Sequence, residues 1–239
     1  MLGLPVTSDD AVLDDPVGAS LRGHHAHLGR HHGRAATYLP GVATFSALPA
    51  GAGQRDWADL AELLGPGAFA DMFSCPARPP AGWDPVFVLE GRQLVWPEGA
   101  PPRPVGGGVV ELGARDVPEM LRLVAETHPG PFWERTVEMG TYLGVRDGGR
   151  LVAMAGERLR PPGWTEISAV CTAPGARGRG HAARLVDALV ARITERGERP
   201  FLHVADANAA ALALYDKLGF HTRRAVTFTG YRTPGGDRP

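Results

Sequence analysis

The sequence predicts an α/β protein whose main part is a mixed, mostly antiparallel sheet flanked by helices, preceded by a smaller α/β region. Two observations predict this fold class. After residue 105, short apolar runs typical of strands alternate with segments that have the 3.6-residue period of helices. The stretch PEGAPPRPVGGG at 97–108 is too rich in proline and glycine for either element, so it divides the chain into regions 1–104 and 105–239.

The composition is that of a folded protein and excludes several classes of function. Apolar residues make up 44% and charged residues 21% of the 239 residues, enough for a sizeable core in one or two domains. A net charge of −1 provides no basic field for nucleic acid. No apolar run reaches the ~18 residues of a membrane helix, no basic segment opens the chain, and two cysteines suit a reducing compartment. We therefore expect a cytoplasmic protein that binds neither nucleic acid nor membrane.

The first region contains predicted elements but few signals of function. We expect a helix from Pro16 to Ala36, a short amphipathic helix at 57–64, and two strands on either side of Gly91. The expected first helix would place three histidines on one face: His24, His27 and His31. No acidic or cysteine ligand lies close by in sequence. A solvated polar face, or a wall of a substrate cleft, is therefore favoured over zinc binding, and no metal is expected.

The prediction of a mixed sheet rests on the order of strands and helices expected in the second region. The expected order is a strand at 109–114, a helix at 116–127, a short helix at 131–140, a hairpin at 141–160, a strand at 165–172, a helix at 182–197, a strand at 201–205, a helix at 208–218 and a strand at 223–231. The hairpin turns at Asp147-Gly148-Gly149, a sequence suited to a tight turn. The last strand is exposed in this order, so a second subunit could pair with it to form a homodimer.

The segment APGARGRGHAARL at 173–185 crowds three glycines and three arginines between a strand and a helix. Unpaired amides and the dipole at a helix N-terminus attract anions, and glycines let the backbone approach phosphate oxygens closely. Arg177 and Arg179 can add charge-assisted hydrogen bonds. The segment therefore predicts a phosphate or pyrophosphate site. It lacks the GK[ST] ending of a nucleotide P-loop, and its glycine spacing differs from that of a dinucleotide site.

Residues downstream narrow this prediction to one family. The loop contains R-x-x-G-x-A at Arg177, Gly180 and Ala182. A strand then leads to N-x-x-A-x-x-x-Y-x-x-L-G-F, which begins at Asn208 and includes Tyr215. Together with the order of elements, these motifs resemble the GNAT superfamily of acyl-CoA N-acyltransferases over roughly the last 130 residues. The resemblance implies a GNAT-type sheet in region 105–239 and acetyl-CoA as co-substrate.

The resemblance also implies roles for individual residues. The pyrophosphate of coenzyme A would bind the loop, namely Arg177, Gly178, Arg179, Gly180, His181 and Ala182. The pantetheine arm would pair with the preceding strand end, namely Val170, Cys171 and Thr172. Asn208 and Ala211 would line the same slot, and Tyr215 would approach the thioester sulfur and protonate the leaving thiolate. Cys171 itself is expected to be a buried small apolar residue rather than a nucleophile.

The reaction implied is transfer of an acetyl group to a primary amine of a small molecule or protein. An amine with a pKa near ~10.4 needs a base at neutral pH. Strand alternation would put Glu166 on the same face as Ser168, Val170 and Thr172, and the matching strand of related histone acetyltransferases carries a glutamate base. Glu166 is therefore the expected base, with Glu157 and His203 as alternatives. Region 1–104 is expected to cover the acceptor side, as a degenerate GNAT-like half.

Two other functions stay open at this point. A non-catalytic acyl-CoA-binding or sensor module would keep the loop but acetylate nothing, although the presence of both Glu166 and Tyr215 argues against it. A nucleotide-phosphate binder would require the loop to hold ATP or GTP. The acceptor is not defined, because one fold of this kind serves many acceptors.

Overall fold

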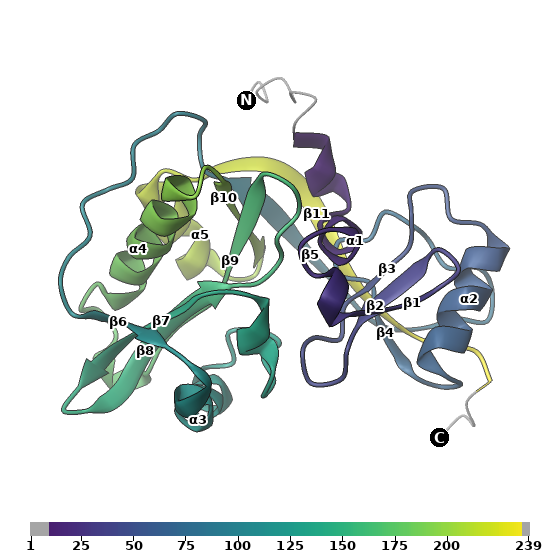
Figure 1. Cartoon of the computed structure of the whole chain (residues 1–239), viewed down its shortest axis with the longest axis horizontal. Helices are drawn as coiled ribbons and strands as arrows, with labels where there is room; N and C mark the ends of the chain where they lie inside the picture. Colours follow the sequence, from purple (N-terminus) through teal and green to yellow (C-terminus); the bar gives the residue numbers. More distant parts are fainter. Residues whose placement is uncertain (1–9, 236–239) are drawn as a thin grey trace.

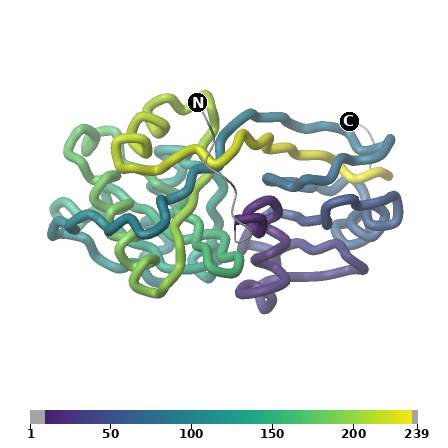
Figure 2. Tube along the Cα trace, turned by 90° about the horizontal axis from the view of Figure 1, so that it is seen from above, coloured from purple at the N-terminus to yellow at the C-terminus, as the bar shows by residue number. Residues whose placement is uncertain are grey.

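A computed structural model describes residues 10–235 of the chain (Figure 1). The elements form two lobes, and the long strands β5 and β11 run side by side from one lobe to the other (Figures 1 and 2). One lobe is built mainly from the second region and contains the helices α3 (Val117–Thr127), α4 (His181–Glu195) and α5 (Ala209–Leu218). The other contains α1 (Pro16–Arg22) and α2 (Gln54–Leu64).

An eight-stranded sheet with the order β4-β11-β5-β10-β9-β8-β7-β6 is the main structural element. Its strands are β4 (Phe69–Asp71), β5 (Asp84–Val95), β6 (Val109–Leu112), β7 (Tyr142–Asp147), β8 (Arg150–Glu157), β9 (Trp164–Thr172), β10 (Arg199–Ala205) and β11 (His221–Arg232). Only β9 and β10 pair in parallel, and every other neighbouring pair is antiparallel. The predicted mixed, mostly antiparallel sheet is confirmed.

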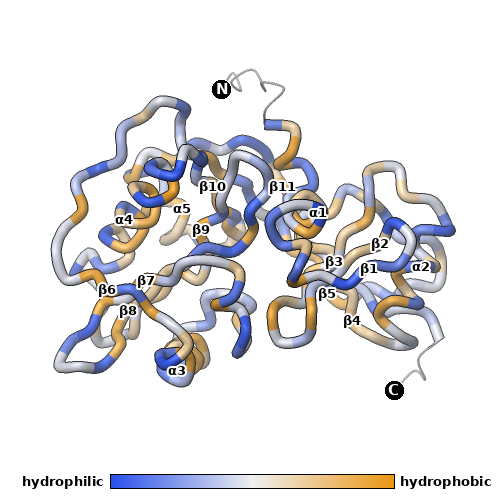
Figure 3. Tube along the Cα trace, viewed as in Figure 1, coloured by the Kyte–Doolittle hydropathy of each residue, from blue (hydrophilic) through white to orange (hydrophobic). Residues whose placement is uncertain are grey.

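Helices cover both faces of this sheet because its strands alternate apolar side chains between the two faces. On β7, Leu143 and Val145 belong to the core beneath α4, whereas Tyr142 belongs to the core beneath α3. Apolar and polar residues alternate along α4 in Figure 3, as expected for a helix with one buried face. The predicted hairpin is also confirmed, with Gly148 and Gly149 between β7 and β8.

The prediction of one helix over Pro16–Ala36 is wrong. The helix α1 ends at Arg22, and the chain continues through a short 3₁₀ turn (Ala26–Leu28) into β1 (Gly29–His32) and β2 (Ala35–Tyr38). Together with β3 (Ser46–Ala47), these strands form a small antiparallel sheet. All four residues of β2 are buried, and burial of consecutive side chains on both faces favours a strand over the helical spacing that the sequence suggested.

Two further expectations need correction. The short helix expected at 131–140 is only a 3₁₀ turn at Thr136–Met139. The two strands expected around Gly91 are one continuous strand, β5. Gly91 is not a turn residue, because a Cβ placed there would lie 2.5 Å from both the Phe228 ring and the Val204 carbonyl oxygen. A glycine inside a strand can mark such a close approach as well as a turn.

The strand β5 also changes the meaning of the boundary at 104/105. It belongs to the first region by sequence, yet it pairs with both β10 and β11 of the second region. The proline- and glycine-rich stretch therefore connects two strands of the same sheet, β5 and β6. Within residues 10–235, no helix is long and apolar enough to cross a membrane.

Candidate active site

The site lies where the parallel strands β9 and β10 separate. Their pairing covers only residues 164–166 of β9 and 199–201 of β10. Further along β9, the register with β8 shifts and Ala169 has a left-handed backbone (φ 52°). Such a bulge bends a strand away from its neighbour. A cavity of about 620 Å³ extends along the separated part of β9, within the usual range for small-molecule sites.

The glycine- and arginine-rich loop ends at the N-terminus of α4 and has the geometry of an anion site. Gly178 and Gly180 have φ values of 77° and 76°, which side chains rarely adopt. No side chain of residues 10–235 caps α4, and the first backbone hydrogen bond of this helix runs from the Arg184 N–H to the Gly180 carbonyl (3.1 Å). The amides of the first turn are therefore left for a ligand. A Cβ at either glycine would meet open space, so a bulky anion has room to approach.

Seven of the eleven residues predicted to bind coenzyme A line the cavity: Val170, Cys171, Thr172, Arg177, Ala182, Asn208 and Ala211. The other four, Gly178, Arg179, Gly180 and His181, belong to the loop and the first turn of α4 without lining the cavity. Arg179 instead forms an exposed ion pair with Asp147 (3.1 Å). Burial raises the pKa of the Cys171 thiol to about 11, as expected for a packing residue that is not a nucleophile.

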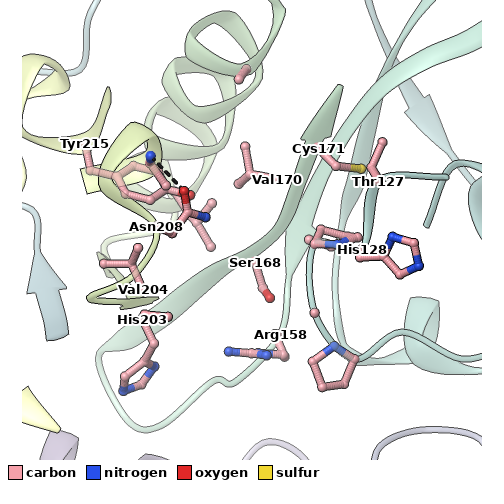
Figure 4. Close-up of a pocket in the computed structure, with 18 of the residues that line it drawn as sticks. Thr127, His128, Arg158, Ser168, Val170, Cys171, His203, Val204, Asn208 and Tyr215 are labelled. Carbon is pink, nitrogen blue, oxygen red and sulfur yellow. Dashed lines mark hydrogen bonds between the residues drawn. The ribbon is translucent and has the colours of Figure 1, made fainter. Parts of the chain in front are cut away.

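Tyr215 lies on α5 and faces Val170 across the cavity (Figure 4). Burial raises the pKa of its hydroxyl to about 12, so the phenol stays protonated at neutral pH and can act as a hydrogen-bond donor. Asn208 fixes the start of the same helix, since its Oδ1 accepts a hydrogen bond from the Ala211 N–H (3.1 Å). The cavity is therefore bordered by β9 on one side and by α5 on the other.

Glu166 occupies a different position from the one expected. It is fully buried and does not line the cavity. Arg158 donates two hydrogen bonds to its carboxylate (2.8 and 2.6 Å), and Nδ1 of His203 donates a third (2.6 Å). Burial opposes ionisation, but these partners outweigh it and lower the pKa of Glu166 to about 2. Its role as general base stays a prediction, since the carboxylate does not line the cavity and is held by Arg158 and His203.

The alternative bases are also held by neighbours. Glu157 does not line the cavity and pairs with Arg196 (2.8 Å). His203 does line it, but both of its ring nitrogens are engaged. Nδ1 bonds Glu166, and Nε2 accepts a hydrogen bond from the side-chain amide of Gln93 (3.1 Å). Burial lowers the pKa of His203, which keeps the ring neutral.

Sequence reasoning missed the far end of the cavity, which is lined by Asp71, Phe73, Phe87, Leu89, Arg158 and Phe228. These residues come from β4, β5, β11 and the chain beside β4 and β8, so they are distant in sequence. Arg158 lies over the rings of Phe45 and Phe73, with its guanidinium carbon 5.0 and 4.6 Å from their centroids. A recognisable signal for this set is absent from the sequence, because no two of its elements form a local motif.

The histidines of the first region lie elsewhere. His31 is in β1, and His24 contacts Arg160 (2.7 Å). The neighbouring His25, which was not singled out, is buried and bonds the Tyr38 hydroxyl (2.9 Å) and the Met139 carbonyl (3.0 Å). Among residues 10–235, no group of three or more histidine, cysteine or acidic side chains could hold a metal ion.

Comparison with known proteins defines the class to which this fold and site belong. The family model described as FR47-like protein matches residues 142–229. A solved structure from Novosphingobium aromaticivorans, described as an acetyltransferase of the GNAT family, is 39% identical with a TM-score of 0.83, and the match covers 94% of this chain and 99% of that one. The chain belongs to the GNAT family of acetyltransferases.

Two further matches agree with this assignment. N-alpha-acetyltransferase RimI of Mycobacterium tuberculosis (strain ATCC 25618 / H37Rv) is 39% identical over 99 residues, which are 40% of this chain and 61% of that protein. The chain therefore matches less than two thirds of this curated relative. A GCN5-related N-acetyltransferase from Kribbella flavida shares the fold, with a TM-score of 0.61 at 15% identity, covering 92% of this chain and 96% of that one.

Proposed function

We propose that the protein transfers an acetyl group from acetyl-CoA to a primary amine of a small molecule or protein. The observation that carries the proposal is the cavity between the separated strands β9 and β10, next to the uncapped N-terminus of α4. A linear acyl thioester with a pyrophosphate at one end matches this combination of a slot and an anion site. A cytoplasmic location and a homodimer remain predictions. β11 pairs with β4 only at Gly230–Arg232, so within the described part of the chain most of that edge has no partner strand.

The residues present fit the parts of acetyl-CoA. The first-turn amides of α4 and Arg177 would hold the pyrophosphate. Residues 170–172 line the slot and are not paired with β10, so their backbone would pair with the pantetheine arm as an added strand would. An amide at the strand end near Val170 would stabilise the oxyanion that forms when the amine attacks the thioester carbonyl.

Tyr215 would supply the proton for the departing thiolate. Its hydroxyl is protonated at neutral pH, and the residue lines the cavity opposite Val170. We expect Tyr215→Phe to lower kcat by about 10²-fold, because general acid catalysis contributes 10²–10⁴-fold, while acetyl-CoA binding is retained. Steady-state kinetics and calorimetry separate the two effects. Unchanged turnover in this variant would contradict Tyr215 as the acid, whereas absence of turnover in the wild type would favour the non-catalytic alternative.

The binding site is tested by calorimetric titration with acetyl-CoA, using Gly180→Glu as the variant. A carboxylate at Gly180 would meet the pyrophosphate, so we expect at least a tenfold loss of affinity, about 1.4 kcal/mol. Gly163→Glu is the matched control. Gly163 has φ 77°, also has open space at its Cβ position, and lies at the opposite end of β9. Equal affinity in both variants would contradict the loop as the pyrophosphate site, and displacement of acetyl-CoA by ATP would favour a nucleotide binder.

A further inference from the structure

The acceptor end of the cavity offers an inference that rests on the proposed acetyl transfer. Opposite the loop side, the cavity is lined by an apolar wall and a carboxylate from parts of the chain that carry no family motif. Phe87 and Leu89 of β5 are 38% and 42% exposed, so much of each side chain is open to a ligand. Phe73 stacks on Phe228 (4.7 Å between centroids, 9° between planes), and this pair forms another part of the apolar wall.

Asp71 is the only carboxylate among the described residues that line the cavity. It ends β4 and is held in place by the Thr44 hydroxyl, which donates a hydrogen bond to Oδ2 (2.8 Å). The described residues form no ion pair with it within 4 Å. A buried carboxylate without an ion-pair partner is costly, which makes it suited to receive a cationic ligand group.

The charged groups around Asp71 leave it as the available proton acceptor. Arg158 attracts it, but the charge of Arg158 is largely offset by two hydrogen bonds to Glu166, and His203 is neutral and engaged at both nitrogens. Burial raises the pKa of Asp71 to about 6, and hydrogen bonds from Thr44 and the Phe73 backbone oppose part of that rise. The group is therefore mostly ionised at pH 7 and can still take up a proton.

We propose that Asp71 binds the ammonium group of the acceptor and accepts its proton, and that the acceptor is a primary amine carried on an apolar or aromatic group. The ammonium passes one proton to an Asp71 oxygen, and the freed lone pair forms the N–C bond with the thioester carbonyl carbon. The C–S bond breaks, and the thiolate takes the proton of the Tyr215 hydroxyl. The nitrogen then loses its second proton, which restores the Tyr215 hydroxyl. The products are the amide, the thiol and a proton on Asp71 that leaves to water.

The test uses 2-phenylethylamine as the probe acceptor and compares Asp71→Asn with Asp206→Asn, a control whose exposed side chain pairs with Arg92. We expect kcat/KM to fall at least 10²-fold in Asp71→Asn and to stay within twofold in the control, with acetyl-CoA affinity unchanged in both by calorimetry. The pH profile of the wild type should lose activity as the pH falls through about 6, and Thr44→Val should move that limb to higher pH. Melting temperatures verify that each variant is folded.

The outcomes separate this proposal from the one on which it rests. An Asp71→Asn variant with wild-type kcat/KM and an unchanged acid limb would overturn the role of Asp71. For the acceptor class, we expect 2-phenylethylamine to be at least tenfold better than ethylamine, because its ring buries apolar area on the wall, and better than phenylalanine, whose carboxylate Asp71 repels. The reverse order would overturn the acceptor class. Failure of the wild type to bind acetyl-CoA would instead defeat the acetyl-transfer function.

Discussion

At the scale of single residues, a buried charge pair sets the shape of the acceptor end. The side chains of Arg158 and Glu166 are 8% and 0% exposed. Nε and Nη2 of Arg158 donate one short hydrogen bond each to the two carboxylate oxygens of Glu166. This bidentate geometry holds the guanidinium against Phe45 and Phe73. Glu166 thus positions a wall residue of the cavity, whichever group takes the amine proton.

Glu166→Gln should therefore destabilise the protein strongly. Removing one partner leaves Arg158 buried without the carboxylate that it is hydrogen-bonded to, which costs about 3–5 kcal/mol. Because the folded-state pKa is lowered from 4.5 to about 2, this stabilisation is present above pH 4.5 and is lost as the pH falls through about 2. Urea denaturation at pH 7 measures the effect. Glu111→Gln, which breaks an exposed pair with Arg192, serves as control and should cost under about 1 kcal/mol. Equal losses in both variants would contradict the argument.

At the scale of elements, the sequence predicted a helix, strand or loop correctly where the residues that indicate it are contiguous in one segment. The loop at 173–180, α4, β9 and α5 were all recognisable, because caps, periodicity and turn residues are contiguous in sequence. β5 shows the limit of this approach. Its Gly91 looks like a turn residue in sequence, and only the packing of β10 and Phe228 against it explains why no side chain is present.

Gly91→Ala should test this explanation. The added methyl group would lie 2.5 Å from the Val204 carbonyl oxygen, which is backbone and cannot rotate away. We expect a loss of about 1–3 kcal/mol in the free energy of unfolding, typical of overpacking. Gly107→Ala is the matched control, since a Cβ there meets nothing within 4 Å, and it should stay within about 0.5 kcal/mol. Chemical denaturation of both variants provides the comparison, and a neutral Gly91→Ala would show that the strands can move apart.

At the scale of the whole molecule, the two predicted regions are joined by buried polar contacts as well as by the shared sheet. Nε2 of the neutral His25 ring donates a hydrogen bond to the Met139 carbonyl of the second region, and Nδ1 accepts one from the Tyr38 hydroxyl. The Gln93 amide similarly donates to the Leu13 carbonyl (2.8 Å), and the Thr136 hydroxyl donates to the Val42 carbonyl (2.8 Å). The first region is thus attached along its length, which allows Asp71 to be held at a fixed position in the cavity.

This attachment should depend on pH. Burial lowers the pKa of His25 from 6.5 to about 4, so the unfolded chain takes up this proton at higher pH than the folded chain. Stability from this group is fully present above pH 6.5 and is lost as the pH falls through about 4, by about 3 kcal/mol at most. Between pH 8 and pH 4, the melting temperature should therefore fall more steeply with decreasing pH for the wild type than for His25→Gln. His221→Gln, at an exposed site, should follow the wild type. Parallel curves for all three would contradict a role for His25.

Local sequence alone was enough to specify the sheet-forming segments of the second region, the anion loop and the family. Each of these depends on residues that are neighbours along the chain, so a short stretch contains the whole signal. The acceptor end was decided by tertiary structure. Asp71, Arg158, His203 and Phe228 come from four separate segments, and their meeting depends on β4 and β5 joining a sheet formed mainly by later residues. The burial of Glu166 has the same origin, because strand alternation predicts a face but not which partners cover it.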